Sequence, residues 1–210
     1  MTNFIESLQW RFASKSFDPN RQVPQEDIDF LKEAIQLSVS SYGLQQYKVL
    51  IIEDKKLQEK LTPASYNQTQ VSEASHVFVF CSITNVGEEL IDDFMENISK
   101  TRGVPKDSLN GFAKMIQAKV DRQTKEQIEE WSDRQSYITM TNLLNACAIK
   151  QIDSCPMEGF IPEKYIEILD LESKNLKPVL VVPIGYRTAD DKYAKIAKVR
   201  KPMEDLFVEM

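Results

Sequence analysis

The sequence is poor in the residues from which many catalytic and phosphate-binding sites are built. It has one histidine, His76, and six glycines among 210 residues. It contains no G-x-G-x-x-G, no G-x-x-x-x-G-K-[ST] and no G-x-S-x-G, so the usual dinucleotide-binding, P-loop and serine-hydrolase motifs are absent. A catalytic triad or a histidine-rich metal site would have to be built around His76, which precedes an apolar strand and is interpreted as structural. If the chain is an enzyme, we expect a cofactor to supply the reactive group.

Cysteine is also scarce, and its placement disfavours the common metal and redox motifs. Cys81, Cys147 and Cys155 lie in apolar surroundings at spacings that match no zinc or dithiol motif. Their odd number argues against a closed disulfide framework. We expect all three to be buried thiols that act as small hydrophobic side chains, and we expect no metal site.

The sequence has neither a long apolar run nor a recognisable targeting signal. No run approaches the ~20 residues needed to cross a bilayer. The first residues lack the basic start and the apolar core of a signal peptide. We therefore expect a soluble, cytoplasmic protein without a membrane partner.

The net charge of −6 argues against general nucleic-acid binding, which needs clustered lysine and arginine. A phosphorylated ligand would need basic residues gathered locally. Arg11 and Lys15 are four residues apart and would share one side if the first helix continued through them. Lys198 and Arg200 would share one side of an extended segment. The alternative is that some of the 26 lysines and arginines are neighbours on the surface without a common ligand.

Hydrophobic patterns predict one domain, residues 1–210, of the α+β class. Continuous apolar runs predict strands at 49–52, 77–81 and 179–184, with a short fourth strand at 151–154. Because these runs do not alternate with polar residues, both faces of the sheet should be covered.

Helical periodicity accounts for most of the remaining chain. The expected helices lie at 2–11, from Pro24 to near Leu37, in two parts of 86–120 joined near 103–105, and at 125–150. Pro24 suits the first helical position. The second half of the long helix is apolar almost all round, a pattern that requires cover on every side and that a subunit interface would satisfy.

Six segments of the sequence form a recognisable ordered set. They are R-F-A-S-K-S-F-D at 11–18, S-V-S-S-Y-G-L-Q-Q-Y at 38–47, E-A-S-H-V-F-V-F-C at 73–81, P-M-E-G-F at 156–160, V-V-P-I-G-Y at 181–186 and K-V-R at 198–200. Taken in order, they resemble the FMN-dependent nitroreductase family, in particular its oxygen-insensitive NAD(P)H nitroreductase and dihydropteridine reductase branch. The resemblance covers nearly the whole chain.

The resemblance implies a central mixed or antiparallel sheet flanked by helices, in an intertwined homodimer with a long central helix and FMN at the interface. It implies that segment 86–120 is a helical lid or insertion. The cofactor-binding residues that it implies are Arg11, Phe12, Ala13, Ser14, Lys15, Ser40, Ser41, Tyr42, Asn67, Gln70, Pro156, Met157, Glu158, Gly159, Lys198 and Arg200.

Within this set, the resemblance assigns distinct roles. Arg11, Lys15, Lys198 and Arg200 would hold the ribityl phosphate and the polar edge of the flavin. Residues 40–42 would come from the partner subunit. The backbone N–H groups of Glu158 and Gly159 would lie near flavin N5, which carries the hydride, so no side chain is expected to be catalytic.

The implied activity is hydride transfer from NAD(P)H, through FMN, to a nitroaromatic, a quinone or a similar acceptor by a ping-pong mechanism. Tyr42 and Phe112 are candidate substrate contacts, and the alternative role for Phe112 is helix packing. The alternative functions are a dihydropteridine or flavin reductase with incidental nitro reduction, and a flavin-binding homodimer without turnover.

The sequence departs from the family pattern at three places. Ala13 stands where a serine is common, and Gln46-Tyr47 where the family often has Pro-Trp. Gln70 stands where the family often has a lysine, which removes a charge beside the expected flavin. These departures bear on the redox potential and on the choice of acceptor.

Overall fold

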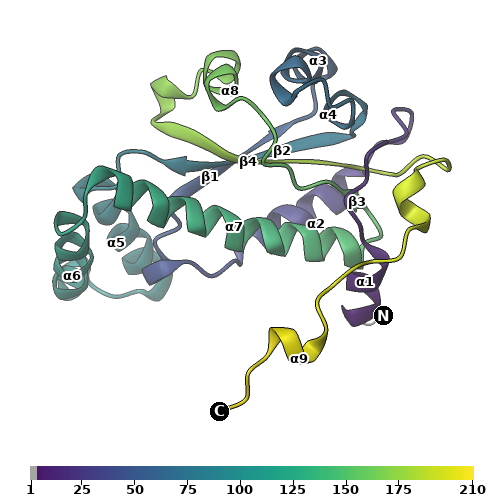
Figure 1. The fold of residues 1–210 in the computed structure, drawn as a ribbon. Coiled ribbons are helices and arrows are strands. Elements are labelled where there is room, and N and C mark those ends of the chain that lie inside the picture. Colours follow the sequence, from purple (N-terminus) through teal and green to yellow (C-terminus); the bar gives the residue numbers. More distant parts are fainter. Residues whose placement is uncertain (1–3) are drawn as a thin grey trace.

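The computed structural model describes residues 4–210, and it has the α+β architecture expected from the sequence (Figure 1). Residues 2 and 3 of the first expected helix lie outside the described residues. The helices are α1 (Phe4–Trp10), α2 (Gln25–Gln36), α3 (Lys55–Leu61), α4 (Gln70–Glu73), α5 (Glu88–Arg102), α6 (Asn110–Asp121), α7 (Lys125–Ile149), α8 (Pro162–Leu169) and α9 (Met203–Leu206). Short 3₁₀ turns occupy Ser41–Gly43, Pro63–Ser65, Lys106–Leu109, Glu172–Lys174 and Lys192–Lys195.

The strands form one antiparallel sheet in the order β1-β2-β4-β3. They are β1 (Tyr47–Ile52), β2 (His76–Ile83), β3 (Asp153–Ser154) and β4 (Leu176–Gly185). All four predicted strands are therefore present. The central strand β2 pairs with β1 and β4, so that Phe80 lies opposite Val49 and Val79 opposite Val181.

Both faces of the sheet are covered, as the continuous apolar runs predicted. Helices α2 and α7 lie on one face, and α3, α4 and α8 lie on the other (Figure 1). Successive β2 side chains point to opposite faces. Phe78 and Phe80 belong to the cluster with α2 and α7, whereas Val77, Val79 and Cys81 belong to the cluster with α3, α4 and α8.

Segment 86–120 is the predicted helix pair. Helix α5 ends at Arg102 and is followed by Gly103. The left-handed backbone of Gly103 (φ 65°) is typical of a glycine at a helix C-terminus. Helices α5 and α6 pack on each other and on Trp131 at the start of α7 in a third apolar cluster, which includes Met95 and Ile116. This cluster lies to one side of the sheet (Figure 1).

The long helix α7 begins at a capping box in which the Thr124 hydroxyl accepts from the Gln127 N–H while the Gln127 side chain accepts from the Thr124 N–H. Its boundaries match the prediction. Within one chain its cover is incomplete, because Tyr137, Ile138 and Ile149 remain 40%, 40% and 43% exposed.

The first helix ends at Trp10, one residue before its predicted end, and does not continue through Arg11 and Lys15, which lie on an extended segment. One local expectation was wrong: Pro24 is the residue before α2 rather than its first residue, because its ψ of 149° is extended. Within residues 4–210, no helix combines the length and apolar character needed to cross a membrane.

Candidate functional site

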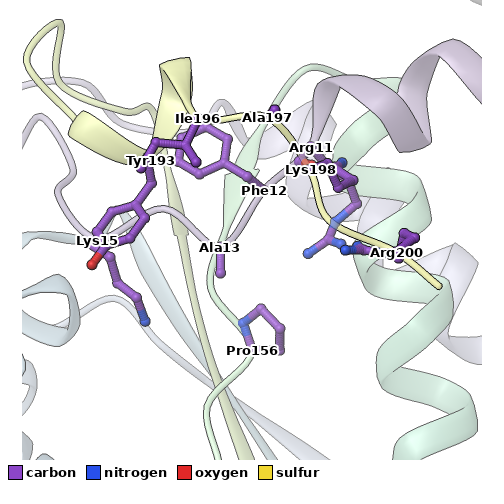
Figure 2. Close-up of a pocket in the computed structure, with 10 residues that line it drawn as sticks. All are labelled: Arg11, Phe12, Ala13, Lys15, Pro156, Tyr193, Ile196, Ala197, Lys198 and Arg200. Atoms are coloured by element: carbon purple, nitrogen blue, oxygen red, sulfur yellow. The ribbon is translucent and has the colours of Figure 1, made fainter.

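The C-terminal segment and the segment after α1 enclose a basic pocket with a volume of about 460 Å³ (Figure 2). This volume lies within the usual range for small-molecule sites. Its lining residues are Arg11, Phe12, Ala13, Lys15, Pro156, Tyr193, Ile196, Ala197, Lys198 and Arg200. Seven of them belong to the predicted cofactor set, so the structure joins segments that lie nearly two hundred residues apart in the sequence.

A backbone bridge and hydrogen bonds to a carboxylate hold the segment after α1 in place. Ala13 forms a parallel bridge with Ser154. The Asp191 carboxylate accepts hydrogen bonds from the Ser14 hydroxyl at 2.9 Å and from the Lys15 N–H at 3.0 Å. Ser14 is fully buried by these contacts. Its side chain therefore positions the segment and does not line the pocket.

Arg187 also holds the end of α1 and the segment that follows it, through contacts with Trp10 and Phe12. Its guanidinium lies 4.3 Å from the ring centroid of Trp10 and 4.4 Å from that of Phe12. It also forms an ion pair of 2.6 Å with the buried carboxylate of Asp153. Cation–π contacts and a buried carboxylate together orient a guanidinium tightly. Arg187 therefore holds both residues that flank Arg11.

Three cations of the pocket, Arg11, Lys198 and Arg200, lie close enough to repel one another. Burial, followed by the charge of Arg200, lowers the pKa of Arg11. Burial, followed by the charges of Arg11 and Arg200, lowers the pKa of Lys198. The Arg11 Nε atom is buried and has no hydrogen-bond partner. A bound anion would satisfy this nitrogen and relieve the repulsion.

Lys198 also has a local structural role. Its ammonium donates to the carbonyl of Leu8 at 2.6 Å, to that of Gln9 at 3.2 Å and to that of Arg11. These carbonyls lie at and beyond the end of α1, where intrahelical donors are missing. Lys198 thus joins the C-terminal segment to α1 and places its charge beside Arg11.

Lys15, which lines the pocket, lies next to buried sulfur and amide groups that do not line it themselves. The Lys15 ammonium donates to the Cys155 sulfur at 3.4 Å, and the Gln70 amide approaches the Met157 sulfur at 3.8 Å. Burial raises the pKa of the Cys155 thiol, against the opposing effect of Lys15. All three cysteines are free and buried, which confirms the expectation from the sequence.

The loop after β3 carries two available backbone donors. Among the hydrogen bonds of the described residues, none uses the N–H of Glu158 or of Gly159 as donor. The loop is held from two sides: the Gln68 amide donates to the Gly159 carbonyl at 2.8 Å, and the Tyr137 hydroxyl donates to the Glu158 carboxylate at 2.6 Å. The carboxylate raises the pKa of Tyr137 to about 12, which keeps this phenol a donor.

The remaining predicted residues lie elsewhere. Ser40, Ser41 and Tyr42 sit beside α7, where the Ser41 N–H donates to Gln135 at 2.9 Å, and they do not line the basic pocket of their own chain. Asn67 has a left-handed backbone, φ 58°, just before α4. Phe112 packs on Phe94 at 6.2 Å between ring centroids, which supports its helix-packing role.

Several residues of this region were not identified from the sequence. Tyr193, Ile196 and Ala197 complete the pocket wall, and Asp191, Arg187 and Gln68 position the segments that carry its donors. No local motif marks these residues, because each acts through a contact with a distant segment. His76 is buried with its Nδ1 at 2.8 Å from the Ser75 hydroxyl, as a structural histidine would be.

The fold is α+β with a pocket lined by four cations, and comparisons with known proteins identify the family. The model of the Nitroreductase family matches residues 8–186. A Staphylococcus haemolyticus protein provisionally named an NAD(P)H nitroreductase is 32% identical, with 97% of this chain and 95% of the relative covered. The chain belongs to the nitroreductase family.

Two further similarities extend over the same length. The major NAD(P)H-flavin oxidoreductase of Aliivibrio fischeri is 28% identical, with 97% of this chain and 96% of the relative covered. A solved structure from Exiguobacterium sibiricum, provisionally named a nitroreductase and determined in complex with FMN, has a TM-score of 0.87 at 20% identity. That alignment covers 100% of this chain and 98% of the other, and it shows a shared fold.

Proposed function

We propose that this protein is an NAD(P)H-dependent oxidoreductase that binds FMN in the basic pocket. One observation carries the assignment: Arg11, Lys198 and Arg200 converge there, and within residues 4–210 none of them forms an ion pair with a carboxylate. A phosphate would neutralise this charge. The family, the flavin oxidoreductase name of the Aliivibrio relative and the FMN complex of the Exiguobacterium structure support the same cofactor.

Residues that line the pocket and residues next to it would bind different parts of such a ligand. Arg11 and Arg200 suit the phosphate because guanidinium groups bind phosphate oxygens in pairs. Lys15 and Gln70 lie near the Cys155 sulfur and suit the polar edge of the ring system. The free N–H groups of Glu158 and Gly159 suit the hydride-accepting nitrogen.

When bound, FMN supplies the centre that takes up and releases a hydride. The protein orients NAD(P)H and then the acceptor at one site, which is a ping-pong cycle. We propose a nitroaromatic or a quinone as the acceptor class and the cytoplasm as the compartment. No acid or base side chain is required for hydride transfer, which agrees with a buried, structural His76.

The cycle is tested on protein purified with its flavin under anaerobic conditions. NADH or NADPH should abolish the visible flavin absorbance, and a quinone or nitroaromatic should restore it. A protein that stays colourless after incubation with FMN would contradict the cofactor assignment. A yellow protein that neither nicotinamide bleaches would favour a flavin-binding protein without turnover, and flavins as preferred acceptors would favour a flavin reductase.

We also propose that two copies form the functional unit, with Ser40, Ser41 and Tyr42 of one chain completing the flavin site of the other. The C-terminal segment leaves the body of the molecule beyond α1 (Figure 1). It exposes 71% of Met203, 59% of Phe207 and 87% of Val208. Ile138 and Ile149 of α7 are also exposed, by 40% and 43%, and a second copy could cover these apolar side chains.

Deletion of residues 202–210 should convert the dimer to a monomer at micromolar concentration and weaken retention of FMN. The physical reason is the loss of the apolar side chains that would cover the second copy. Light scattering after size-exclusion chromatography measures the mass. Glu209→Gln on the same segment is the control and should remain dimeric. A monomeric full-length protein that still retains FMN would contradict the dimer proposal.

A further inference from the structure

A second pocket, which shares no lining residue with the basic pocket, lies beside Tyr42 at the end of α6. Its volume is about 360 Å³. The residues that line it are Tyr42, Met115, Ala118, Lys119, Arg122 and Gln123. Three of these six residues, Met115, Ala118 and Lys119, belong to α6, and Arg122 directly follows the helix in line with them.

The two cations of this pocket have no acidic partner. Within the described chain, neither Lys119 nor Arg122 takes part in an ion pair. The nearest acidic neighbour in sequence, Asp121, accepts a hydrogen bond from Gln117 at 2.7 Å instead. On a chain with a net charge of −6, two unpaired cations at one pocket are a local concentration of positive charge.

Tyr42 and Met115 give the pocket an aromatic and an apolar contact beside its cations. Tyr42 holds a left-handed backbone, φ 60°, which is strained for a residue with a side chain. Its ring meets Trp131 edge-on at 6.2 Å and Phe112 at 6.4 Å between centroids. The Lys119 ammonium lies 5.2 Å from the Trp131 centroid. Met115 is 50% exposed and offers an adaptable apolar surface.

We propose that this pocket is a recognition subsite for an anionic group carried by a planar small molecule, with Lys119 and Arg122 binding the anion and Tyr42 and Met115 contacting the ring. The proposed oxidoreductase function enters this inference in one way: it indicates which anionic molecules would reach the pocket. In a hydride-transfer cycle the anion belongs either to the ribose phosphate of NADP(H) or to a carboxylate on an aromatic acceptor.

A different role would also place cations here. Lys119 lies in the last turn of α6 and Arg122 directly follows it, where positive charge stabilises the helix dipole. That role alone predicts lower thermal stability on removal of the charges and no change in ligand affinity. The ligand measurement therefore separates the two.

The test is calorimetric titration of the protein as purified, without reductant, with two matched pairs of probes. NADP⁺ and NAD⁺ differ by one phosphate, and para-nitrobenzoate and para-nitrobenzamide differ by the charge of one group. The variants are the double substitution Lys119→Gln/Arg122→Gln, the charge-conserving Lys119→Arg, and Lys114→Gln. Lys114 is the matched control because it lies on the same helix but lines another pocket.

The double variant should bind the anionic member of at least one pair about five- to tenfold more weakly, the loss expected for partly exposed charged contacts. The neutral member should be unaffected, and Lys119→Arg and Lys114→Gln should behave like the wild type. Weakening of NADP⁺ identifies the hydride donor as the source, and weakening of para-nitrobenzoate identifies the acceptor. Equal affinities for both members of each pair, or no binding of any probe, would overturn the proposal. Failure of the cofactor assignment would appear separately, as a protein that binds no FMN.

Discussion

Arg200→Ala should weaken the binding of FMN by about tenfold or more, because a hydrogen bond to a charged group is worth about 1.5–3 kcal/mol. Arg200 lines the basic pocket beside Arg11 and Lys198, and no carboxylate in the described chain pairs with it. The substitution also relieves repulsion among the three cations, which places the expected loss near the lower end of that range. Fluorescence titration of flavin-free protein with FMN measures the dissociation constant.

Arg102→Ala is the matched control for this variant. Arg102 is an exposed arginine in the last turn of α5, and it lines none of the pockets described above. Its substitution should leave the dissociation constant for FMN unchanged. If Arg200→Ala and Arg11→Ala both bind FMN as tightly as the wild type, the phosphate does not lie among these arginines.

Asp153→Ala should lower the free energy of unfolding by about 3 kcal/mol, the lower limit for breaking a buried ion pair, because Arg187 keeps some access to water. The Asp153 side chain is 4% exposed and that of Arg187 22%. The Asp153 carboxylate also accepts a hydrogen bond from the backbone N–H of Arg187 at 2.8 Å. The variant therefore leaves both the guanidinium and the backbone N–H of Arg187 without their partner. Urea denaturation of the flavin-free protein measures the change.

The same variant should weaken FMN binding, because Arg187 orients Trp10 and Phe12 on either side of Arg11. Glu130→Ala is the control for the ion pair. Glu130 pairs with Arg134 at 2.9 Å, but both side chains are about two-thirds exposed. An exposed pair of this spacing contributes only about 0.3–0.5 kcal/mol. A loss for Asp153→Ala as small as that for Glu130→Ala would show that Arg187 does not depend on Asp153.

Much of the fold could be predicted because its strongest signals are local. The strands β2 and β4 are buried on both faces, so their apolar runs are unbroken. Helix α7 begins at a capping box and, with 25 residues, is the longest element of the described chain. Helices α3, α4 and α8 were not predicted. They have seven, four and eight residues, too few to establish a helical period.

The candidate site could be predicted only in part, for a different reason. The cations Arg11, Lys15, Lys198 and Arg200 stand in recognisable segments, and the structure brings them to one pocket. The residues that hold those segments are determined by tertiary contact. Arg187 stacks on two rings and pairs with a residue of β3, and no pattern within the sequence around Arg187 indicates this contact.

The central claim is that the basic pocket holds the phosphate of FMN, and comparison of FMN with riboflavin tests it most directly. The two ligands share the ring system and differ in the phosphate. Titration of the flavin-free wild-type protein should give a dissociation constant for FMN about a hundredfold lower than that for riboflavin, since charge-assisted contacts of guanidinium with phosphate are among the strongest available. In Arg200→Ala this advantage should shrink. Equal affinities of the wild-type protein for FMN and riboflavin would contradict the account.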